Sequence, residues 1–490
     1  MPKKTKYTPV IGMEVHVQAK TRSKMFCRCT NDPFCKKPNI HTCPTCMGLP
    51  GSLPVPNEEA ILAVMELGAA LNCKISDYSC FARKSYFYPD LPKGYQISQY
   101  DNPFCRNGHL HVNGKKIRIL RVHLEEDAGK NFHPKGTNFT LVDLNRAGVP
   151  LMELVTEPDI ESAEEARIFC QELQLILRYL GIADADMEKG QMRCEANISL
   201  TPAKARGAKK FAGTKVEIKN LNSFKAVERS IDYEIKRQQR ILERGEKIMA
   251  ETRGWSEGKQ ATVNQRSKEE ASEYRYFPEP DIPPIFTDKK QVTQLIKNMP
   301  ELPEGFRLRL QKEYKLHPKT VEVLVFNKKL GDYFEESASE IANWWKDTGN
   351  KKIPADLYQL LANYIVTEIK KCWIKNQETL CTPENLAELI VMLKENKVNS
   401  SAAQTILAKM LKKGGDPSQI AQDLDLVQIS DTETLKEAIN KVLKNNPGPL
   451  AELKAGKVKT LQFLIGQVMK ETRGKANPQI VAEIIRKKLG

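Results

Sequence analysis

Several segments in the first half of the chain alternate apolar and polar residues, the pattern of β-strands that bury one face. In residues 11–17 the methionine and two valines point one way, while Glu14 and His16 point the other. The same alternation recurs in residues 142–145, 193–200 and 215–219. If these strands pair in one antiparallel sheet, the face opposite the core gathers polar side chains. They are Glu14, His16, Asp143, Asn145, Arg193, Glu195, Asn197, Ser199, Lys215, Glu217 and Lys219.

Residues 123–130, with the sequence HLEEDAGK, add three adjacent carboxylates beside a histidine and a lysine. Clustered carboxylates repel one another, so they need either solvation or a cation, most simply a hard divalent metal. A solvated acidic turn is the alternative. Strand parity places His123, Glu125 and Asp127 together and Glu126 on the opposite face, and a β-bulge would reverse this assignment.

The polar face therefore has the composition of a metal and phosphate site. Carboxylates suit Mg²⁺, which leaves positions for water and phosphate oxygens, while lysine and arginine bind the remaining phosphate charge. The candidate metal-binding residues are Glu14, His16, Glu217 and the carboxylates of residues 125–127. His16 is an unusual ligand for so hard a cation. It either orients a carboxylate or indicates a site that accepts Mn²⁺.

No glycine-rich phosphate-binding motif of the Walker or Rossmann type occurs, so any nucleotide is held by a sheet and loops. In the loop at residues 83–101, Lys84 and Lys93 are available for phosphates and the aromatic rings for a base. Core packing is the alternative for the rings of Tyr86, Phe87 and Tyr88. The predicted nucleotide-binding residues combine this loop with the strands and are Lys84, Tyr88, Lys93, Arg193, Glu195, Asn197 and Lys215.

Two short-spaced cysteine pairs, Cys27-x-Cys29 and Cys43-Pro-Thr-Cys46, are separated by thirteen residues. This spacing suits a tetrahedral zinc site with four thiolates, which would be structural because no open coordination position remains. Cys35 and His41 lie inside the loop as rival ligands, and reduced, unligated cysteines are the alternative. The remaining cysteines are scattered and no secretion signal precedes them, which disfavours a disulfide scaffold.

The length of 490 residues allows roughly two to four domains. We predict an α+β fold in which a mostly antiparallel, sheet-built domain at residues 1–290 precedes two helical domains, at residues 291–408 and 409–490. The first boundary follows the proline-rich segment 277–284, and the zinc-binding loop of residues 27–46 lies in the first domain.

The chain has a net charge of +15, which suggests a polyanionic partner. The last 37 residues hold nine Lys or Arg and only two acidic residues. An RNA-binding surface and a merely solvated helix face are the alternatives for Lys457, Lys459, Lys470, Arg473 and Lys475. No apolar run approaches membrane-spanning length and the first residues lack an apolar segment, so we expect a soluble, cytoplasmic protein without a membrane contact.

Seven motifs, in order along the chain, resemble those of the GatB family, the B subunits of the aspartyl/glutamyl-tRNA amidotransferases. They are VIGMEVHVQ at 10–18, HLEEDAGK at 123–130, YRYFPEPD at 274–281 and the segments 86–99, 142–159, 187–200 and 215–224. The resemblance covers essentially the whole chain. It implies a sheet-built cradle domain, a helical domain and a tRNA-binding tail domain, assembled with the A and C subunits, GatA and GatC, into a heterotrimer.

The resemblance also implies a ligase reaction that uses ATP and Mg²⁺. The side-chain carboxylate of Glu on tRNA(Gln), or of Asp on tRNA(Asn), is phosphorylated and then amidated with ammonia that GatA, the glutaminase, releases from glutamine. Glu14, His16, Glu125 and Glu126 match the family's metal-binding motif, and with Asp127 they form the predicted catalytic set. The predicted metal ligands are Glu14, His16, Glu125, Glu126 and Glu217, and the four cysteines match the members that carry structural zinc. Cys35 is outside that pattern.

The chain lacks a recognisable glutaminase nucleophile, so its ammonia must come from a partner. Two other functions compete with this interpretation. One is a tRNA-binding assembly protein without catalysis, which the acidic sheet face disfavours because RNA-binding surfaces do not collect carboxylates. The other is an ATP-dependent ligase that acts on a small carboxylic acid, which the basic tail disfavours.

Overall fold

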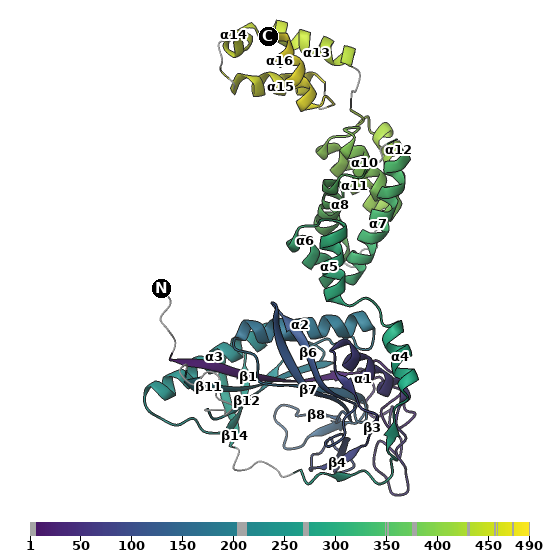
Figure 1. Cartoon of the computed structure of the whole chain (residues 1–490), viewed down its shortest axis with the longest axis vertical. Coiled ribbons are helices and arrows are strands. Elements are labelled where there is room, and N and C mark those ends of the chain that lie inside the picture. The colour runs from purple at the N-terminus through teal and green to yellow at the C-terminus, as the bar shows by residue number, and fades with distance from the viewer. Residues whose placement is uncertain are drawn as a thin grey trace. The chain divides into compact units, whose positions relative to one another are not determined.

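The computed structural model describes residues 6–202, 213–267, 274–347, 349, 352–374, 380–428, 432–454, 457, 459–472 and 475–489. The chain divides into two units, residues 1–303 and 304–490. The first unit is built on a large sheet, and the described part of the second is helical (Figure 1). The α+β fold predicted from the sequence is confirmed.

A nine-stranded sheet with the order β14-β13-β12-β11-β1-β10-β7-β6-β2 forms the centre of the first unit. Neighbouring strands are antiparallel except β12 and β13, which are parallel. The central strands are β11 (Met192–Pro202), β1 (Tyr7–Gln18), β10 (Pro150–Thr156) and β7 (Lys115–Glu126). The outer strands are β14 (Ala261–Ser267), β13 (Glu251–Ser256), β12 (Val216–Leu221), β6 (Cys105–Val112) and β2 (Lys74–Ile75).

Three helices, α1 (Glu58–Ala70), α2 (Ala163–Leu180) and α3 (Phe224–Glu243), pack on one face of this sheet. In Figure 1, α2 and α3 lie along the same side of the strands. The odd-numbered side chains of β1 are buried in the core that the sheet shares with these helices, and they are Ile11, Met13, Val15 and Val17. The even-numbered side chains therefore point to the opposite, polar face.

Local sequence sets the ends of these helices. Ser162 accepts a hydrogen bond from the Glu165 N–H at 3.1 Å and begins α2, which Gly181 ends with a φ of 74°. Ser223 begins α3 in the same way, through the Ala226 N–H at 3.1 Å. Each such cap stabilises a helix by about 1 kcal/mol.

The loop at residues 83–101 enters a smaller sheet with the order β15-β4-β5. Its strands are β4 (Ala82–Ser85), β5 (Tyr95–Ser98) and β15 (Phe277–Pro278). The Gln96 amide donates a hydrogen bond to the Glu126 carbonyl at 2.7 Å, and the Leu124 N–H donates one to Gln99 Oε1 at 3.2 Å. These bonds hold the loop against the acidic strand β7. Two further strand pairs are β3 (Tyr78–Ser79) with β16 (Ile285–Phe286) and β8 (Lys130–Phe132) with β9 (Leu141–Asp143).

The helical unit contains two successive groups of helices. The first comprises α5 (Pro303–Glu313), α6 (Pro318–Phe326), α7 (Lys328–Asp347), α8 (Ala355–Tyr364), the π-helix η3 (Ile365–Ile369), α9 (Lys370–Ile374), α10 (Pro383–Lys394), α11 (Ser400–Lys413) and α12 (Pro417–Asp423). The second comprises α13 (Thr432–Asn445), α14 (Pro447–Lys454), α15 (Lys459–Glu471) and α16 (Pro478–Leu489). Its apolar core includes Leu435, Ile439, Leu464, Val468, Val481 and Ile485.

The division between the units lies later in the chain than the predicted boundary at residues 290 and 291. Helix α4 (Lys289–Asn298) belongs to the first unit because Leu295, Met299 and Leu302 pack against its core. The predicted boundary at residues 408 and 409 falls inside α11. Apolar contacts, which the local sequence does not reveal, place α4 in the first unit.

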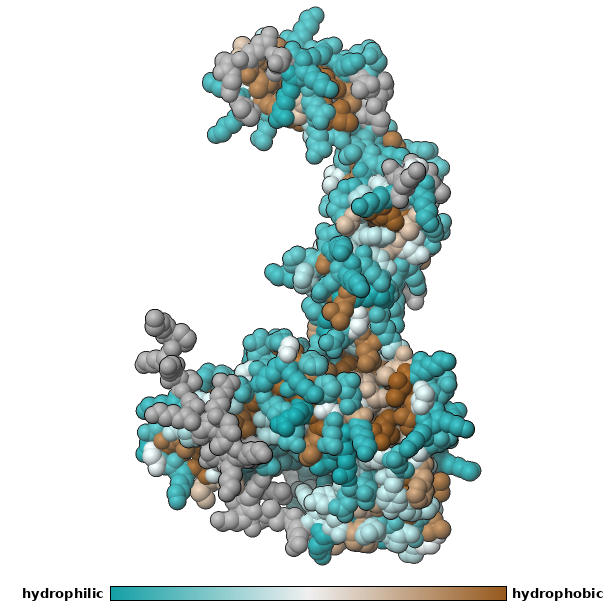
Figure 2. All heavy atoms as spheres, in the orientation of Figure 1, coloured by the Kyte–Doolittle hydropathy of each residue, from teal (hydrophilic) through white to brown (hydrophobic). Residues whose placement is uncertain are grey.

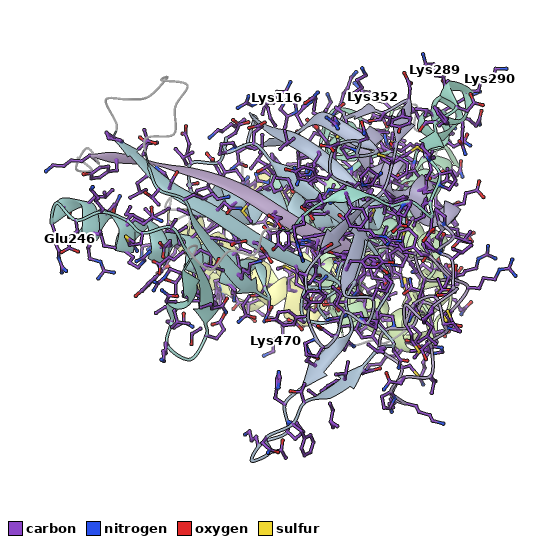
Figure 3. All side chains as sticks on the ribbon, turned by 90° about the horizontal axis from the view of Figure 1, so that it is seen from below. Lys116, Glu246, Lys289, Lys290, Lys352 and Lys470 are labelled. Carbon is purple, nitrogen blue, oxygen red and sulfur yellow. The ribbon has the colours of Figure 1, made fainter. Side chains whose placement is uncertain are left out.

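Hydrophilic side chains cover most of the face seen in Figure 2, with apolar patches between them. Lys116 of β7 and Lys289 and Lys290 of α4 are exposed and point away from the body of the first unit (Figure 3). Among the described helices, none combines the length and the apolar character needed to span a bilayer.

Candidate active site

The polar face of the sheet brings five metal-ligand side chains together, here called the Glu/His cluster: Glu14, His16, His123, Glu125 and Glu153. Strand register explains why they meet. His16 of β1 lies opposite Glu153 of β10, which in turn lies opposite His123 of β7. Glu14 and Glu125 are two residues from these histidines and share their face, since strand side chains alternate with a period of two.

His16 contacts all three carboxylates of the cluster. Its Nε2 lies 3.4 Å from Glu153 Oε2, 3.6 Å from Glu125 Oε1 and 3.8 Å from Glu14 Oε1. His123 Nε2 lies 3.3 Å from the same Glu153 oxygen. The side chains of Glu125 and Glu153 are only 3% and 8% exposed. Carboxylates buried this deeply require neutralisation by nearby positive charge.

Protonation of the cluster reflects this crowding. Burial lowers the pKa of His16, but the hydrogen bond to Glu153 and the charges of the three carboxylates outweigh it and raise the pKa to about 9. Burial and the charge of Glu153 raise the pKa of Glu14 to about 7. Burial also opposes ionisation of Glu153, yet His123 and His16 hold the pKa of that carboxyl well below its ordinary value. A divalent cation bound here would displace the His16 proton.

The donor atoms fit such a cation. Two groups, Glu14 with His16 and Glu153, and His123 with Glu125 and Glu153, each have their ligand atoms within 4.8 Å of one another. Carboxylate oxygens suit Mg²⁺, and imidazole nitrogens suit softer divalent metals. The set therefore fits a hard or borderline divalent cation, with Glu153 common to both groups.

Polar neighbours surround the cluster. Ser98 of β5 donates a hydrogen bond to Glu125 Oε2 at 3.2 Å, and Arg121 lies 3.7 Å from Glu153 Oε1. Burial lowers the pKa of Lys84, but the charges of Glu125, Tyr276 and Glu153 outweigh it and hold that pKa above its ordinary value. Lys84 of β4 is thus a cation close to the carboxylates.

Glu126 points away from the cluster, as strand parity predicts. Its Oε1 accepts a hydrogen bond from the Ile97 N–H at 2.9 Å and forms an ion pair with Lys93. It also lines a small cavity together with Cys27 and Cys46. Of the two predicted adjacent ligands, the structure brings only Glu125 to the Glu/His cluster.

Asp127 returns to the polar face and positions its neighbours. Its two oxygens accept hydrogen bonds from Gln18 at 2.9 Å and from Arg193 at 3.0 Å. Burial favours the neutral acid, but the charges of Arg193 and Arg146 lower the pKa of Asp127 below its usual range. Asp127 is therefore a buried anion that fixes Arg193 beside the cluster.

The remaining strand residues predicted to act here have other partners. Lys219 Nζ lies 2.8 Å from Glu195 and 3.3 Å from Glu217, and the Thr252 hydroxyl donates to Glu217 at 2.8 Å. Glu217 is thus held by β12 and β13 neighbours and does not reach the cluster.

Of the other predicted nucleotide-binding residues, two line a cavity and one is exposed on the surface. Asn197 and Lys215 line a cavity of about 400 Å³ beside Gly12, two residues before Glu14 on the same strand. Tyr88 is 66% exposed, so its ring is not part of the core.

All four cysteines of the two short-spaced pairs converge: Cys27, Cys29, Cys43 and Cys46 have their sulfurs within 4.8 Å of one another. Each of the twelve cysteines in the chain is free of a disulfide. The hydrogen bond from Cys27, aided by the charge of Lys24, lowers the pKa of Cys46 to about 5 although burial opposes this. Lys24 is fully buried with its Nζ 3.9 Å from the Cys46 sulfur, so it offsets part of the charge of a tetrathiolate.

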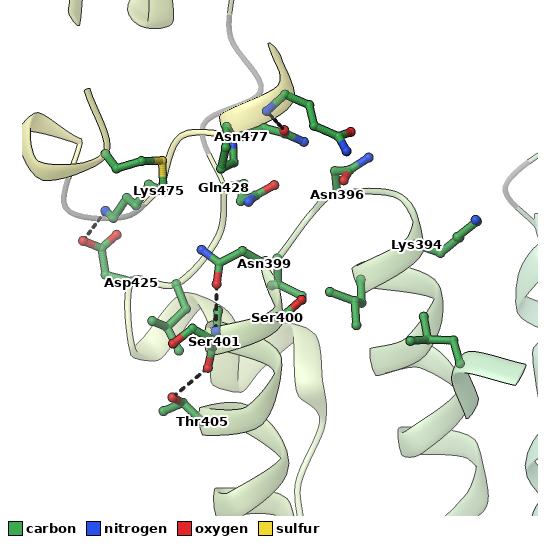
Figure 4. A pocket seen from close by; sticks show the side chains of 18 residues that line it. Lys394, Asn396, Asn399, Ser400, Ser401, Thr405, Asp425, Gln428, Lys475 and Asn477 are labelled. Carbon is green, nitrogen blue, oxygen red and sulfur yellow. Dashed lines mark hydrogen bonds and ion pairs between the residues drawn. The ribbon is translucent and has the colours of Figure 1, made fainter. Parts of the chain in front are cut away.

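A larger recess, of about 980 Å³, lies in the helical unit at the start of α11 (Figure 4). Asn399 caps this helix, accepting a hydrogen bond from the Ala402 N–H at 2.8 Å. Lys475 forms an ion pair with Asp425, and the Gln428 N–H donates to the Lys397 carbonyl at 2.8 Å. Of the basic tail residues named from the sequence, Lys475 is half-buried beside Asp425. Arg473 lies outside the described residues.

Sequence reasoning missed Glu153 as a member of the cluster. The only signal was a single carboxylate in the otherwise apolar stretch PLMELV of β10. An isolated charge in a buried strand indicates a functional position, because burying it without a partner costs several kcal/mol.

Comparison with known proteins gives one match in each of the two units, the first ending inside α4. A family model described as the GatB/GatE catalytic domain matches residues 9–293, and one described as the GatB domain matches residues 332–489. The B subunit of the aspartyl/glutamyl-tRNA(Asn/Gln) amidotransferase of Carboxydothermus hydrogenoformans is 45% identical over 496 residues, 99% of both chains. The proteins of the same name from Thermotoga petrophila and Thermodesulfovibrio yellowstonii are 44% and 46% identical over 492 residues, again 98% or more of each chain.

Fold, site and matches together define a two-part protein in which a sheet-built catalytic domain precedes a helical domain. The chain belongs to the GatB family, the B subunits of aspartyl/glutamyl-tRNA(Asn/Gln) amidotransferases. The resemblance predicted from its motifs is confirmed.

Proposed function

We propose that this chain is the component of a tRNA-dependent amidotransferase that activates a tRNA-linked carboxylate with ATP and then amidates it. Its family supports the role of an enzyme component, a ligase that forms a carbon–nitrogen bond. The substrates are Glu on tRNA(Gln), Asp on tRNA(Asn), or both. The observation that carries the chemistry is the Glu/His cluster, a buried set of carboxylates flanked by Lys84 and Arg193.

The reaction needs activation because a carboxylate is anionic and resonance-stabilised, and hence a poor electrophile. Attack of a carboxylate oxygen on the γ-phosphorus of ATP, with departure of ADP, gives an acyl phosphate. Ammonia then attacks the acyl carbon, phosphate leaves and the nitrogen loses a proton, giving the amide. Phosphoryl transfer depends on positioning and charge neutralisation more than on a protein nucleophile.

Different residues of the polar face would bind the metal ion and the phosphate groups. Glu14, His16, Glu125 and Glu153 would hold Mg²⁺, which would neutralise phosphate charge when bound. Lys84 binds phosphate oxygens, and Asp127 keeps Arg193 directed at the same region. Glu126 and Glu217 would have to leave Lys93 and Lys219 before they reached a metal at the cluster.

The nucleotide would be held on two sides of the cluster. On one side, Lys84 comes from β4, while Tyr88 and Lys93 come from the segment between β4 and β5, and Lys93 would have to leave Glu126 to reach a nucleotide at the cluster. On the other side are the main-sheet residues and the residue just before β12: Arg193, Glu195, Asn197 and Lys215. The cavity beside Gly12 offers space for a base or for the aminoacyl group of the tRNA.

The assembly has further expected components. Cys27, Cys29, Cys43 and Cys46 would bind one structural zinc ion, with Lys24 as a buried counter-charge. Ammonia would come from the glutaminase partner GatA, with GatC completing a cytoplasmic heterotrimer. The basic tail would contact the tRNA backbone, so neutralising Lys459 and Lys470 should flatten the dependence of log affinity on log salt.

Isotope-labelled ATP and charged tRNA test the proposal in the assembled complex. Phosphate release that depends on Glu-tRNA(Gln) or Asp-tRNA(Asn) is the expected result, and the better substrate identifies the natural one. Release with free glutamate would instead show a ligase for a small acid. Absence of release with every substrate, in a complex that still binds tRNA, would show a non-catalytic binding protein.

A further inference from the structure

A second group of metal-ligand side chains lies inside the cysteine loop, between the two cysteine pairs. Asp32, Cys35 and His41 have their ligand atoms within 4.8 Å of one another. We propose that these three residues form a second zinc site, separate from the four-cysteine site. The two groups share no residue, so each can hold its own ion.

The geometry suits a shared metal ion better than direct contact. His41 Nε2 lies 3.9 Å from Asp32 Oδ2, which is too far for a hydrogen bond. Zinc binds nitrogen and oxygen at about 2.0–2.2 Å and sulfur at about 2.3 Å, so two ligands of one ion stand roughly 3–4 Å apart. All three side chains are partly accessible, which leaves a path for the ion to enter.

Charge also fits. One thiolate, one carboxylate and one neutral imidazole balance the charge of a divalent cation, so no further counter-charge is required. The mixture of sulfur, nitrogen and oxygen donors selects zinc over Mg²⁺, which takes oxygen ligands. Three protein ligands leave one coordination position open for water, unlike the closed four-cysteine site.

The ligands are held in place by contacts that no metal supplies. The Phe34 N–H donates to Asp32 Oδ1 at 3.2 Å, which leaves Oδ2 directed at His41. The His41 N–H donates to Asn145 Oδ1 at 2.9 Å, and its carbonyl accepts from Lys24 at 2.6 Å. Asn145 and Lys24 are both fully buried, so they anchor His41 to the body of the first unit.

The contacts of His41 with Asn145 and Lys24 suggest that the proposed zinc site stabilises the position of the cysteine loop. Asn145 lies in the segment that leads into β10, the strand that carries Glu153. An ion held by Asp32, Cys35 and His41 would therefore fix the loop against this segment. The four-cysteine ion alone closes only the two ends of the same loop.

Zinc content of the full-length protein, purified without added metal or chelator, tests the proposal. We expect about two equivalents for the wild type and about one for Cys35→Ser or for Asp32→Asn. Cys43→Ser/Cys46→Ser should also retain about one, which separates failure of this site from failure of the four-cysteine site. Cys80→Ser, a half-buried cysteine outside both groups, is the matched control and should keep both ions.

Alkylation of the wild type gives a second measurement that needs no variant. The rate of iodoacetamide labelling at Cys35, followed by peptide mass spectrometry, should fall at least tenfold when zinc is restored to chelator-treated protein. Protection should be lost in His41→Ala while Cys46 stays protected. Equal Cys35 labelling with and without zinc, or one zinc equivalent that Cys35→Ser does not reduce, would overturn the proposal.

Discussion

The Glu/His cluster and the four-cysteine group both gather metal-ligand side chains, but the fold brings them together by different means. The first lies on neighbouring strands, where hydrogen-bonded register sets which residues stand opposite one another. The second lies on the loop between β1 and α1, which the structure describes throughout and which contains no strand or helix. Strands position ligands before any ion arrives, whereas a loop depends on its ion for more of its shape. Losing a ligand should therefore impair chemistry at the cluster and folding at the loop.

The largest expected effect is on activity, at Glu153. Glu153→Gln removes the carboxylate that contacts both His16 and His123. Loss of several kcal/mol of charge stabilisation should lower tRNA-dependent amidation by more than about a hundredfold, while the melting temperature changes little. Steady-state kinetics across a Mg²⁺ titration measure it, with Glu157→Gln, just beyond β10, as the control. Wild-type kinetics in Glu153→Gln would remove this residue from the site.

A smaller loss is expected from a residue that only supports a ligand. Ser98→Ala deletes the hydroxyl that donates to Glu125 at 3.2 Å. Such supporting contacts change metal affinity or activity by roughly tenfold, so the Mg²⁺ concentration for half-maximal activity should rise by about that factor. Ser76→Ala, which loses a hydrogen bond to the Pro103 carbonyl, is the matched control. An equal shift in both variants would contradict a specific role for Ser98.

Glu125 and Glu126 allow a loss of activity and a loss of stability to be compared at neighbouring residues of one strand. Glu125→Gln should act like Glu153→Gln, since it removes a cluster carboxylate. Glu126→Gln leaves Lys93 without its buried partner and should lower the free energy of unfolding by about 2 kcal/mol, with an activity change of a few fold. Denaturant unfolding and kinetics on both variants decide this. An activity loss in Glu126→Gln that matches Glu125→Gln would instead support the prediction that Glu126 is a metal ligand.

The smallest effect on activity is expected at the cysteine loop. Cys43→Ser/Cys46→Ser should lose about one equivalent of zinc and melt at a lower temperature, with amidation at low temperature changed less than about twofold. Metal analysis and calorimetry of the full-length chain test it. A variant that keeps its stability but loses amidation would show that the loop takes part in the chemistry.

The sequence revealed those parts of the site that depend on local pattern. Alternation in β1 placed Glu14 and His16 on one face. Parity in β7 placed Glu125 and Glu126 on opposite faces unless a bulge intervened, although the predicted ligand set contained both residues. Glu153 joined the cluster only through the pairing of β10 between β1 and β7, a register between segments far apart in the chain. No local period encodes that pairing, which is why this residue was missed.

The partners of buried charges were hidden for the same reason. Lys93 and Glu126 are separated by 33 residues, and Thr252 and Glu217 by 35. The end of the first unit at Pro303 likewise depends on how α4 packs on the sheet-built core. Motif spacing, by contrast, sufficed for the cysteines, because the four sulfurs come from two short segments of one loop.

The opposite orientations of Glu125 and Glu126 restrict how this chain can change in length. Deleting one residue in β7 before this pair would bring Glu126 to the histidines and Glu125 to the buried position of Leu124. Inserting one residue there would instead bring Glu125 to Lys93 and away from the histidines. A point substitution changes one side chain, whereas a register shift of one residue would misplace every ligand that β7 supplies. Length variation near this strand is therefore expected to be tolerated at the β6–β7 turn, where Asn113 and Gly114 are exposed, and rejected between residues 117 and 126.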